Sequence, residues 1–96
     1  MEHWHSTTTD RLIDTLLKLE SREEGYALLT DLCTVKEIKD MAQRLEVALL
    51  LKEGKSYQEI SASTGVSAAT ISRVSRCLNY GSGGYTKALE KMEDKA

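Results

Sequence analysis

The sequence predicts an all-α protein with six helices and no sheet. Two observations support this fold class: hydrophobic residues recur at helical spacing along most of the chain, and leucine, alanine and charged residues dominate a composition without proline or phenylalanine. With 96 residues, the chain is expected to form one domain over residues 9–96, preceded by a flexible tail over residues 1–8. A domain of this size buries a limited core, which a second copy of the chain would enlarge.

Three helices are predicted in the first half of the chain. The first covers about 9–20, because apolar residues between 12 and 17 follow helical spacing. The second covers about 21–33, and the third runs from 34 to about 53, where Gly54 can adopt the backbone conformation that ends a helix. The second and third helices each begin at a candidate capping box, formed by Ser21 with Glu24 and by Thr34 with Glu37.

The third predicted helix is unusually apolar. Between Met41 and Leu51, only Gln43, Arg44 and Glu46 are polar. A helix that is hydrophobic nearly all round must be buried on several sides. We therefore infer that it forms the centre of a dimer, while a monomeric core helix wrapped by its own neighbours is the alternative.

A helix-turn-helix over residues 56–80 is the most informative feature, with its two helices at about 56–64 and 67–80. Gly65 supplies the corner residue that tolerates a positive φ, and Val66 follows as the apolar residue of the turn. Three further apolar residues can point into the small core between the crossed helices, namely Ile60, Ile71 and Val74.

The ends of this motif are also marked. Ser56 with Glu59 forms a candidate capping box for its first helix, and Ser67 can cap the second. Thr64 departs from the pattern, because its site is more often apolar. Together these features predict duplex DNA as the ligand.

Glycines at 81, 83 and 84 then break the helical pattern, and a last helix is expected over about 85–94. Tyr80 and Tyr85 flank these glycines. They could form a binding element, but we favour the interpretation that both are aromatic caps on the end of the core.

Charge is distributed unevenly along the chain, although the net charge is only −2. Residues 1–53 carry seven Lys/Arg and eleven Asp/Glu, whereas residues 54–80 carry three Lys/Arg and one Glu. The positive charge thus lies on the predicted reading unit, which favours a specific DNA binder with modest non-specific affinity.

The predicted DNA contacts fall into three groups. Short side chains at the start of the second helix would lie close to the bases, Arg73 and Arg76 would bind phosphates, and residues at the rim would support them. The base-proximal group is Ser67, Ala68, Ala69 and Ser72, and the rim group is Lys55, Tyr57, Gln58 and Thr70. For Thr70 the alternative is a hydroxyl that bonds its own helix backbone.

Other chemistry finds little support in the sequence. Cys33 and Cys77 lack metal-ligand spacing and are expected to be free thiols that pack as small apolar side chains. His3 and His5, which flank Trp4, offer too few ligands for a functional metal site. No set of catalytic residues is visible, so we expect no enzyme and no metal. No membrane span or signal peptide is visible either, so we expect no membrane association and a cytoplasmic location.

The segment QRLEVALLLKEGKSYQEISASTGVSAATISRVSRCLNYGSGGY resembles the Trp repressor superfamily, and its ending RVSRCLNYGSGGY resembles the YerC/YecD branch. The resemblance extends from about Arg11 to Glu90. It implies an intertwined, all-helical homodimer whose central and N-terminal helices exchange between subunits. It also implies sequence-specific binding to operator DNA through one reading helix per subunit, and a repressor is the expected kind of regulator.

The Trp repressor binds tryptophan as a co-repressor, and the resemblance marks four positions as a candidate effector pocket. Arg44 and Arg73 match the two arginines that flank the indole ring, but Val74 stands where the repressor has glycine and Cys77 where it has serine. A valine side chain would project into the space of the ligand, and a thiol is a weaker hydrogen-bond partner than a hydroxyl. We therefore expect that tryptophan is not a cofactor and that any small-molecule effector is a different compound. The two arginines are expected to form a salt bridge and to bind phosphate.

Two functional hypotheses from different classes follow. The first is a homodimeric, DNA-binding transcriptional regulator. The second is a protein-interaction or dimerisation module that keeps the fold without DNA affinity, motivated by the net acidity and the few cations.

Overall fold

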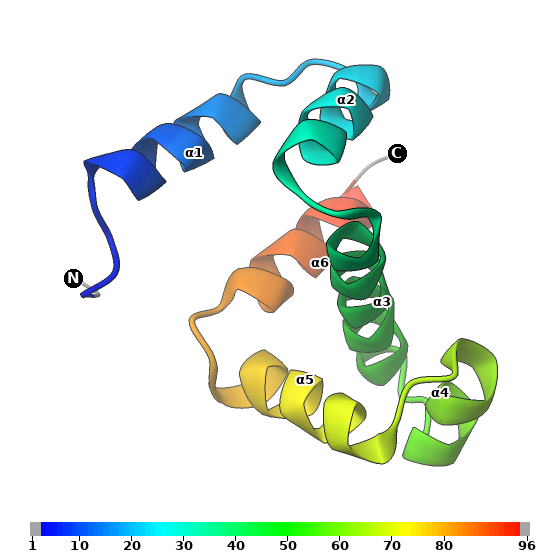
Figure 1. Cartoon of the computed structure of the whole chain (residues 1–96). Coiled ribbons are helices and arrows are strands. Elements are labelled where there is room, and N and C mark those ends of the chain that lie inside the picture. Colours follow the sequence, from blue (N-terminus) through cyan, green and yellow to red (C-terminus); the bar gives the residue numbers. More distant parts are fainter. Residues whose placement is uncertain (1–2, 95–96) are drawn as a thin grey trace. The chain divides into compact units, whose positions relative to one another are not determined.

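The computed structural model describes residues 3–94, the side chain of residue 94 excepted, and all regular structure in this range is helical (Figure 1). This confirms the predicted all-α class with six helices. The helices are α1 (Thr7–Leu17), α2 (Arg22–Leu32), α3 (Val35–Lys52), α4 (Tyr57–Thr64), α5 (Ala68–Tyr80) and α6 (Gly84–Asp94).

The chain divides into two compact units, residues 1–38 and residues 39–96. The first unit contains α1, α2 and the start of α3, and the second contains the rest of α3 with α4, α5 and α6. The expectation of one domain over residues 9–96 remains a prediction. Residues 1, 2, 95 and 96 of the predicted tail and domain lie outside the described residues.

Helix α1 begins two residues before its predicted start, and it ends at Leu17 rather than near residue 20. The Ser6 N–H donates to Thr9 Oγ1 over 2.8 Å, and the Thr9 N–H donates to Ser6 Oγ over 3.2 Å. This reciprocal capping starts the helix at Thr7, so Thr7 and Thr8 of the predicted tail are helical.

The other two starts in the first half were predicted more closely. Thr34 and Glu37 form the expected reciprocal pair, with distances of 2.8 and 3.1 Å. At α2, Ser21 Oγ accepts the Glu24 N–H, but the Glu24 carboxylate accepts the N–H of Glu20 instead of that of Ser21. The cap is therefore present while the predicted capping box is wrong in its second bond.

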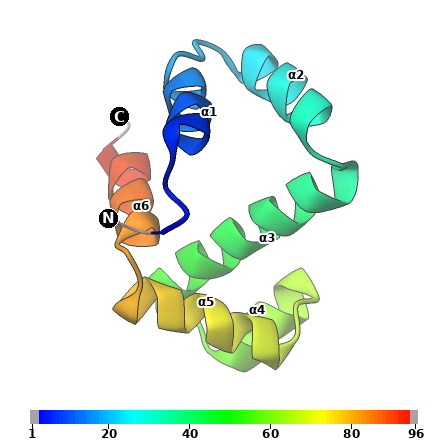
Figure 2. The ribbon, with the colours of Figure 1, turned by 60° about the vertical axis from the view of Figure 1, so that its left-hand side comes forward.

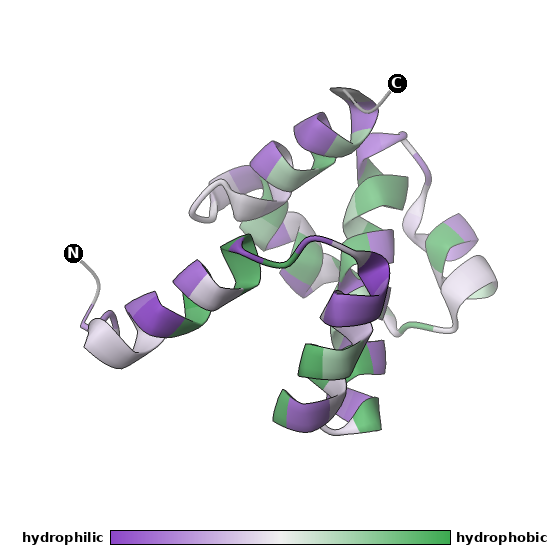
Figure 3. Ribbon diagram, turned by 90° about the horizontal axis from the view of Figure 1, so that it is seen from above, coloured by the Kyte–Doolittle hydropathy of each residue, from purple (hydrophilic) through white to green (hydrophobic). Residues whose placement is uncertain are grey.

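In the single chain, neither α1 nor α2 contains a buried residue. Hydrophobic and hydrophilic residues alternate along the ribbon of α1 (Figure 3). Large apolar side chains remain exposed, and Leu17, Tyr26 and Val35 are 77, 65 and 64% accessible. The first unit thus presents apolar surface that its own residues do not cover.

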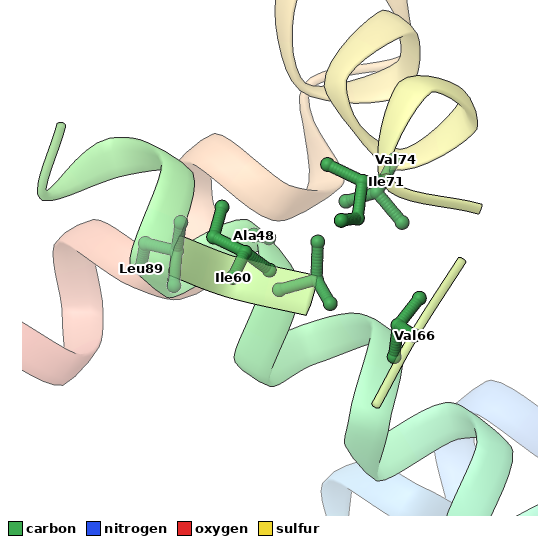
Figure 4. Packing of buried hydrophobic residues seen from close by; sticks show 7 residues of the cluster. Ala48, Ile60, Val66, Ile71, Val74 and Leu89 are labelled. Atoms are coloured by element: carbon green, nitrogen blue, oxygen red, sulfur yellow. The ribbon is translucent and has the colours of Figure 1, made fainter. Parts of the chain in front are cut away.

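The core lies in the second unit, where α5 contacts both α4 and α6 (Figure 2). Hydrophobic side chains from α3, α4, the turn after α4, α5 and α6 converge there (Figure 4). The buried set is Val47, Ala48, Ile60, Val66, Ile71, Val74 and Leu89. It contains every residue predicted for the helix-turn-helix core.

Helix α3 is unevenly covered by the other helices of the second unit. Val47 and Ala48 are completely inaccessible, whereas Met41 and Leu45 are 40 and 38% exposed in the single chain. The helices of the second unit therefore leave this part of α3 partly uncovered, and both the dimer and the core helix wrapped by its own neighbours remain predictions. Gly54 ends the segment with a φ of 89°, as its position predicted.

Candidate nucleic-acid interface

Helices α4 and α5 meet at the predicted corner. Gly65 has a φ of 76° and a ψ of 6°, and its N–H donates to the Ser61 carbonyl oxygen over 2.8 Å. A side chain would strain this left-handed conformation, so glycine suits the position. Val66 follows with 6% exposure and belongs to the core. The structure thus confirms the geometry of a helix-turn-helix.

Both helices of the motif begin at the predicted capping serines. At α4, the Ser56 N–H donates to Glu59 Oε1 over 2.8 Å, and the Glu59 N–H donates to Ser56 Oγ over 3.1 Å. The pKa of the Glu59 carboxyl lies below its ordinary value, chiefly because the Ser56 N–H bonds the ionised form. The Ser56 side chain and the charge of Lys55 act in the same direction.

Thr64, which departs from the usual pattern, bonds both sides of the corner. Its hydroxyl donates to the Ile60 carbonyl oxygen over 2.7 Å and accepts the Val66 N–H over 3.2 Å. Its own carbonyl oxygen accepts a 3.0 Å hydrogen bond from Nε2 of Gln43 on α3. The role of Gln43 was not predicted, since these partners are 21 residues apart and no local pattern links them.

Helix α5 has a buried face and, opposite it, an exposed face that we call the reading face. Ile71 and Val74 are 0 and 2% exposed. Every 3.6 residues the helix returns to the same side, so positions 69, 73 and 76 share the opposite face. Ala69, Arg73 and Arg76 are exposed there, and the other residues of the predicted base-proximal group are exposed as well: Ser67, Ala68 and Ser72.

Ser67 and Thr70 are already bonded to each other. Ser67 Oγ accepts the Thr70 N–H and donates to Thr70 Oγ1, both over 3.2 Å. Ser67 therefore caps α5 and keeps limited hydrogen-bonding capacity for a base. Thr70 is half-buried, and its hydroxyl contacts that of Ser67 rather than the helix backbone expected as the alternative.

The remaining rim residues lie at the start of α4. Lys55 precedes the capping serine, and Tyr57 and Gln58 occupy the first turn. All three are exposed, with 41% of Tyr57 accessible. The structure therefore places the ten predicted contacts in two groups, three at the beginning of α4 and seven on α5 with its cap.

The structure brings the four candidate effector residues together. Arg44, Arg73, Val74 and Cys77 all line one cavity of about 500 Å³ between α3, the turn and α5. Asp40 lines it too, one helical turn before Arg44. Val74 lines the cavity and is almost completely buried in the core.

Cys33 and Cys77 are free thiols, as expected. Cys33 is half-buried, but Cys77 is exposed, so the prediction that Cys77 packs as a small apolar side chain is wrong. Cys77 lines the cavity, and the residues of α5 that pack in the core are its neighbours Val74 and Leu78.

Tyr80 and Tyr85 also differ from each other. Tyr85 is half-buried and packs against the core, as predicted for an aromatic cap. Tyr80 is 86% exposed, so the same prediction is wrong for Tyr80. The reason is helical phase, because Tyr80 lies opposite Ile71 and Val74 on α5.

Between residues 3 and 94, no helix is long and apolar enough to span a membrane. Over the same part of the chain, no group of three or more His, Cys, Asp or Glu is placed to hold a metal ion.

The fold and the exposed face of α5 define a helix-turn-helix protein. The family model of the Trp repressor protein matches residues 7–93, and the chain belongs to this family. It is 51% identical over 85 residues to the uncharacterized protein YerC of Bacillus subtilis, which covers 88% of this chain and 82% of that protein.

Two solved structures extend the comparison. A candidate Trp repressor from Staphylococcus aureus shares 44% identity with a TM-score of 0.89, covering 96% of this chain and 92% of that one. A TrpR-like protein from Eubacterium eligens shares 40% identity with a TM-score of 0.89, covering 93 and 92%. These similarities confirm the TrpR-like fold and the YerC branch inferred from the sequence.

Proposed function

We propose that the protein is a sequence-specific DNA-binding transcriptional regulator that acts as a homodimer, with one α5 helix per half-site in the major groove. The observation that carries this proposal is the reading face of α5, where short side chains and two arginines are exposed together. No Asp or Glu occurs between residues 60 and 89, so this region can approach a polyanion without repulsion. Membership of the Trp repressor family, a family of regulators rather than enzymes, supports the same function.

The side chains suggest how the DNA is read. Alanine and serine let the helix backbone approach the bases closely, with methyl groups available to thymine and hydroxyl groups available to bases, phosphates or water. The guanidinium groups of Arg73 and Arg76 would hold the phosphates and so fix the register. Lys55, Tyr57 and Gln58 would add backbone contacts from the start of α4.

Exposed apolar surface supports the homodimer. Exposed large side chains on α1, α2 and the first half of α3 are unusual for a small monomeric protein. A second copy of the chain, intertwined through these helices, would cover them. Two reading helices would then lie about 34–36 Å apart and recognise a pseudo-palindrome.

The test is a selection of bound duplexes from fragmented genomic DNA by the purified protein. The wild type is compared with Arg73→Ala/Arg76→Ala and with a control, Lys87→Ala/Lys91→Ala, which removes two exposed cations from α6. We expect a two-fold motif enriched by the wild type and the control but not by the α5 variant. Equal retention of all sequences by the three proteins would overturn the proposal.

Light scattering should give the mass of a dimer, and a monomer mass would overturn the intertwined assembly.

A second candidate function is a protein-interaction or dimerisation module on the same fold. It is favoured by the net charge of −2 and by the few cations of the reading unit. The two functions differ in their dependence on the arginines. Full activity of Arg73→Ala/Arg76→Ala in cells would favour the interaction module.

A further inference from the structure

Tyr80 has no structural role that explains its position at the end of α5. It is 86% exposed, the highest value among the large hydrophobic side chains of the described residues. Tyr85, five residues later, packs against the core. Removal of the Tyr80 ring would therefore leave the core intact.

Its helical phase aligns Tyr80 with the reading face. It follows Arg76 by four residues and Arg73 by seven, so all three side chains lie on one side of α5. Ala69 lies on the same side, eleven residues earlier and roughly 16 Å away along the helix axis. Tyr80 thus forms the far end of the row that begins with the base-proximal residues.

The chain also fixes where this row ends. The Gly81 N–H donates to the Cys77 carbonyl oxygen over 2.9 Å, and a Cβ at Gly81 would lie only 2.3 Å from that oxygen. A side chain at position 81 would require the backbone to shift, and the extended conformation of Gly81, with a φ of −85° and a ψ of −157°, ends α5 directly after Tyr80. The phenol is held on the last turn of a helix rather than on a loop, so little ordering is needed when it binds.

The surroundings of Tyr80 favour a polyanion over a protein surface. It is the only large hydrophobic residue exposed on α5, so no apolar patch continues from it. Its neighbours on the same face are arginines and short residues, and the nearest carboxylates along the chain are Glu59 and Glu90. A neutral hydroxyl beside cations suits a phosphate oxygen.

We propose that Tyr80 contacts the DNA backbone, where its hydroxyl donates a hydrogen bond to a phosphate and its ring packs against the adjoining sugar. This inference rests on the proposed function and extends the footprint of α5 beyond the base-reading end. Because the phenol is uncharged, the contact releases no counterion, and because it touches the backbone, it carries no sequence preference. It differs from a base contact because it carries no sequence preference, and from an arginine because it leaves the salt dependence of binding unchanged.

The experiment measures affinity for a selected duplex and for an unrelated duplex of equal length, each over a series of KCl concentrations. Tyr80→Phe should weaken binding to both duplexes by roughly fivefold, the effect of one lost hydrogen bond. The slope of log affinity against log salt should stay at the wild-type value. Thr86→Val, which removes an exposed hydroxyl from α6, should bind as the wild type does.

Wild-type affinity of both Tyr80→Phe and Tyr80→Ala would overturn the contact. If Arg73→Ala/Arg76→Ala abolishes binding in that case, the proposed function stands and only the role of Tyr80 is wrong. If the arginine variant also binds normally, the proposed function fails with it. Loss of the dimer mass in Tyr80→Ala would identify a second subunit as the occupant and would likewise overturn the contact.

Discussion

The side-chain amide of Gln43 donates a 3.0 Å hydrogen bond to the carbonyl oxygen of Thr64, which joins α3 to the corner of the helix-turn-helix. Thr64 in turn bonds Ile60 and Val66 through its hydroxyl. The corner is thus fixed by polar contacts in addition to the buried Val66. These contacts connect the apolar helix α3 to the position of the reading helix.

Gln43→Met should reduce the free energy of unfolding by about 0.5–1.5 kcal/mol, because the side chain keeps its length but loses its donor. Since the bond also positions the corner, we expect weaker DNA binding. Thermal unfolding and binding to a selected duplex measure the two effects. An unchanged melting temperature together with unchanged affinity would contradict the role assigned to Gln43.

Gly65→Ala should destabilise the protein by about 1–2 kcal/mol, since alanine is disfavoured at a φ of 76°. Gly25→Ala is the matched control, because Gly25 lies within α2 and a Cβ there meets no atom within 4 Å. The control should be more stable than the wild type by about 0.5–1 kcal/mol, as alanine favours a helix interior. Chemical unfolding of both variants checks the opposite signs.

The local parts of the fold could be predicted from sequence. The corner glycine, the core of the motif and the capping serines depend on residues a few positions apart, so their spacing is visible in the chain. The start of α1 was missed because threonine, not the usual Glu or Gln, completes its capping box.

The non-local parts could not be predicted from spacing. The Gln43 bond joins residues 21 apart. The exposure of Cys77 and of Tyr80 depends on how α5 is rotated against its neighbours. The cavity lined by Arg44, Arg73, Val74 and Cys77 was anticipated only through the family resemblance.

Acid should weaken the start of α4 through Glu59. The pKa of this carboxyl is lowered in the folded protein, mainly by the Ser56 N–H. The stabilisation it gives is therefore complete above the pKa of the carboxyl in the unfolded chain and is lost as pH falls through the lower folded pKa. Glu59→Gln keeps an oxygen acceptor for the Ser56 N–H but cannot titrate. Its melting temperature should fall less than that of the wild type between pH 6 and pH 3, and equal falls would exclude this contribution.

Tryptophan should neither bind the protein nor alter its affinity for DNA. The nearly buried Val74 forms a wall of the cavity that contains Arg44 and Arg73, and Cys77 offers only a weak hydrogen-bond partner there. Isothermal titration with millimolar tryptophan should give no binding heat, and the affinity for a selected duplex should be the same with and without it. Saturable binding heat that disappears in Arg44→Ala would show that the cavity accepts the amino acid.

Ala69→Leu should abolish close contact between α5 and the bases. Ala69 is exposed on the reading face, and leucine is a good helix former, so α5 itself should remain intact. The larger side chain would separate the helix from the groove and weaken specific binding by about 1–3 kcal/mol, the usual cost of an overpacked contact.

Ala88→Leu is the matched control for Ala69→Leu, since Ala88 is exposed on α6. Anisotropy titrations with a selected duplex should show the loss for Ala69→Leu alone, with melting temperatures of both variants near the wild-type value. Tight specific binding by Ala69→Leu would mean that the start of α5 does not enter the groove, and the reading helix would then have to approach DNA through another part of its exposed face.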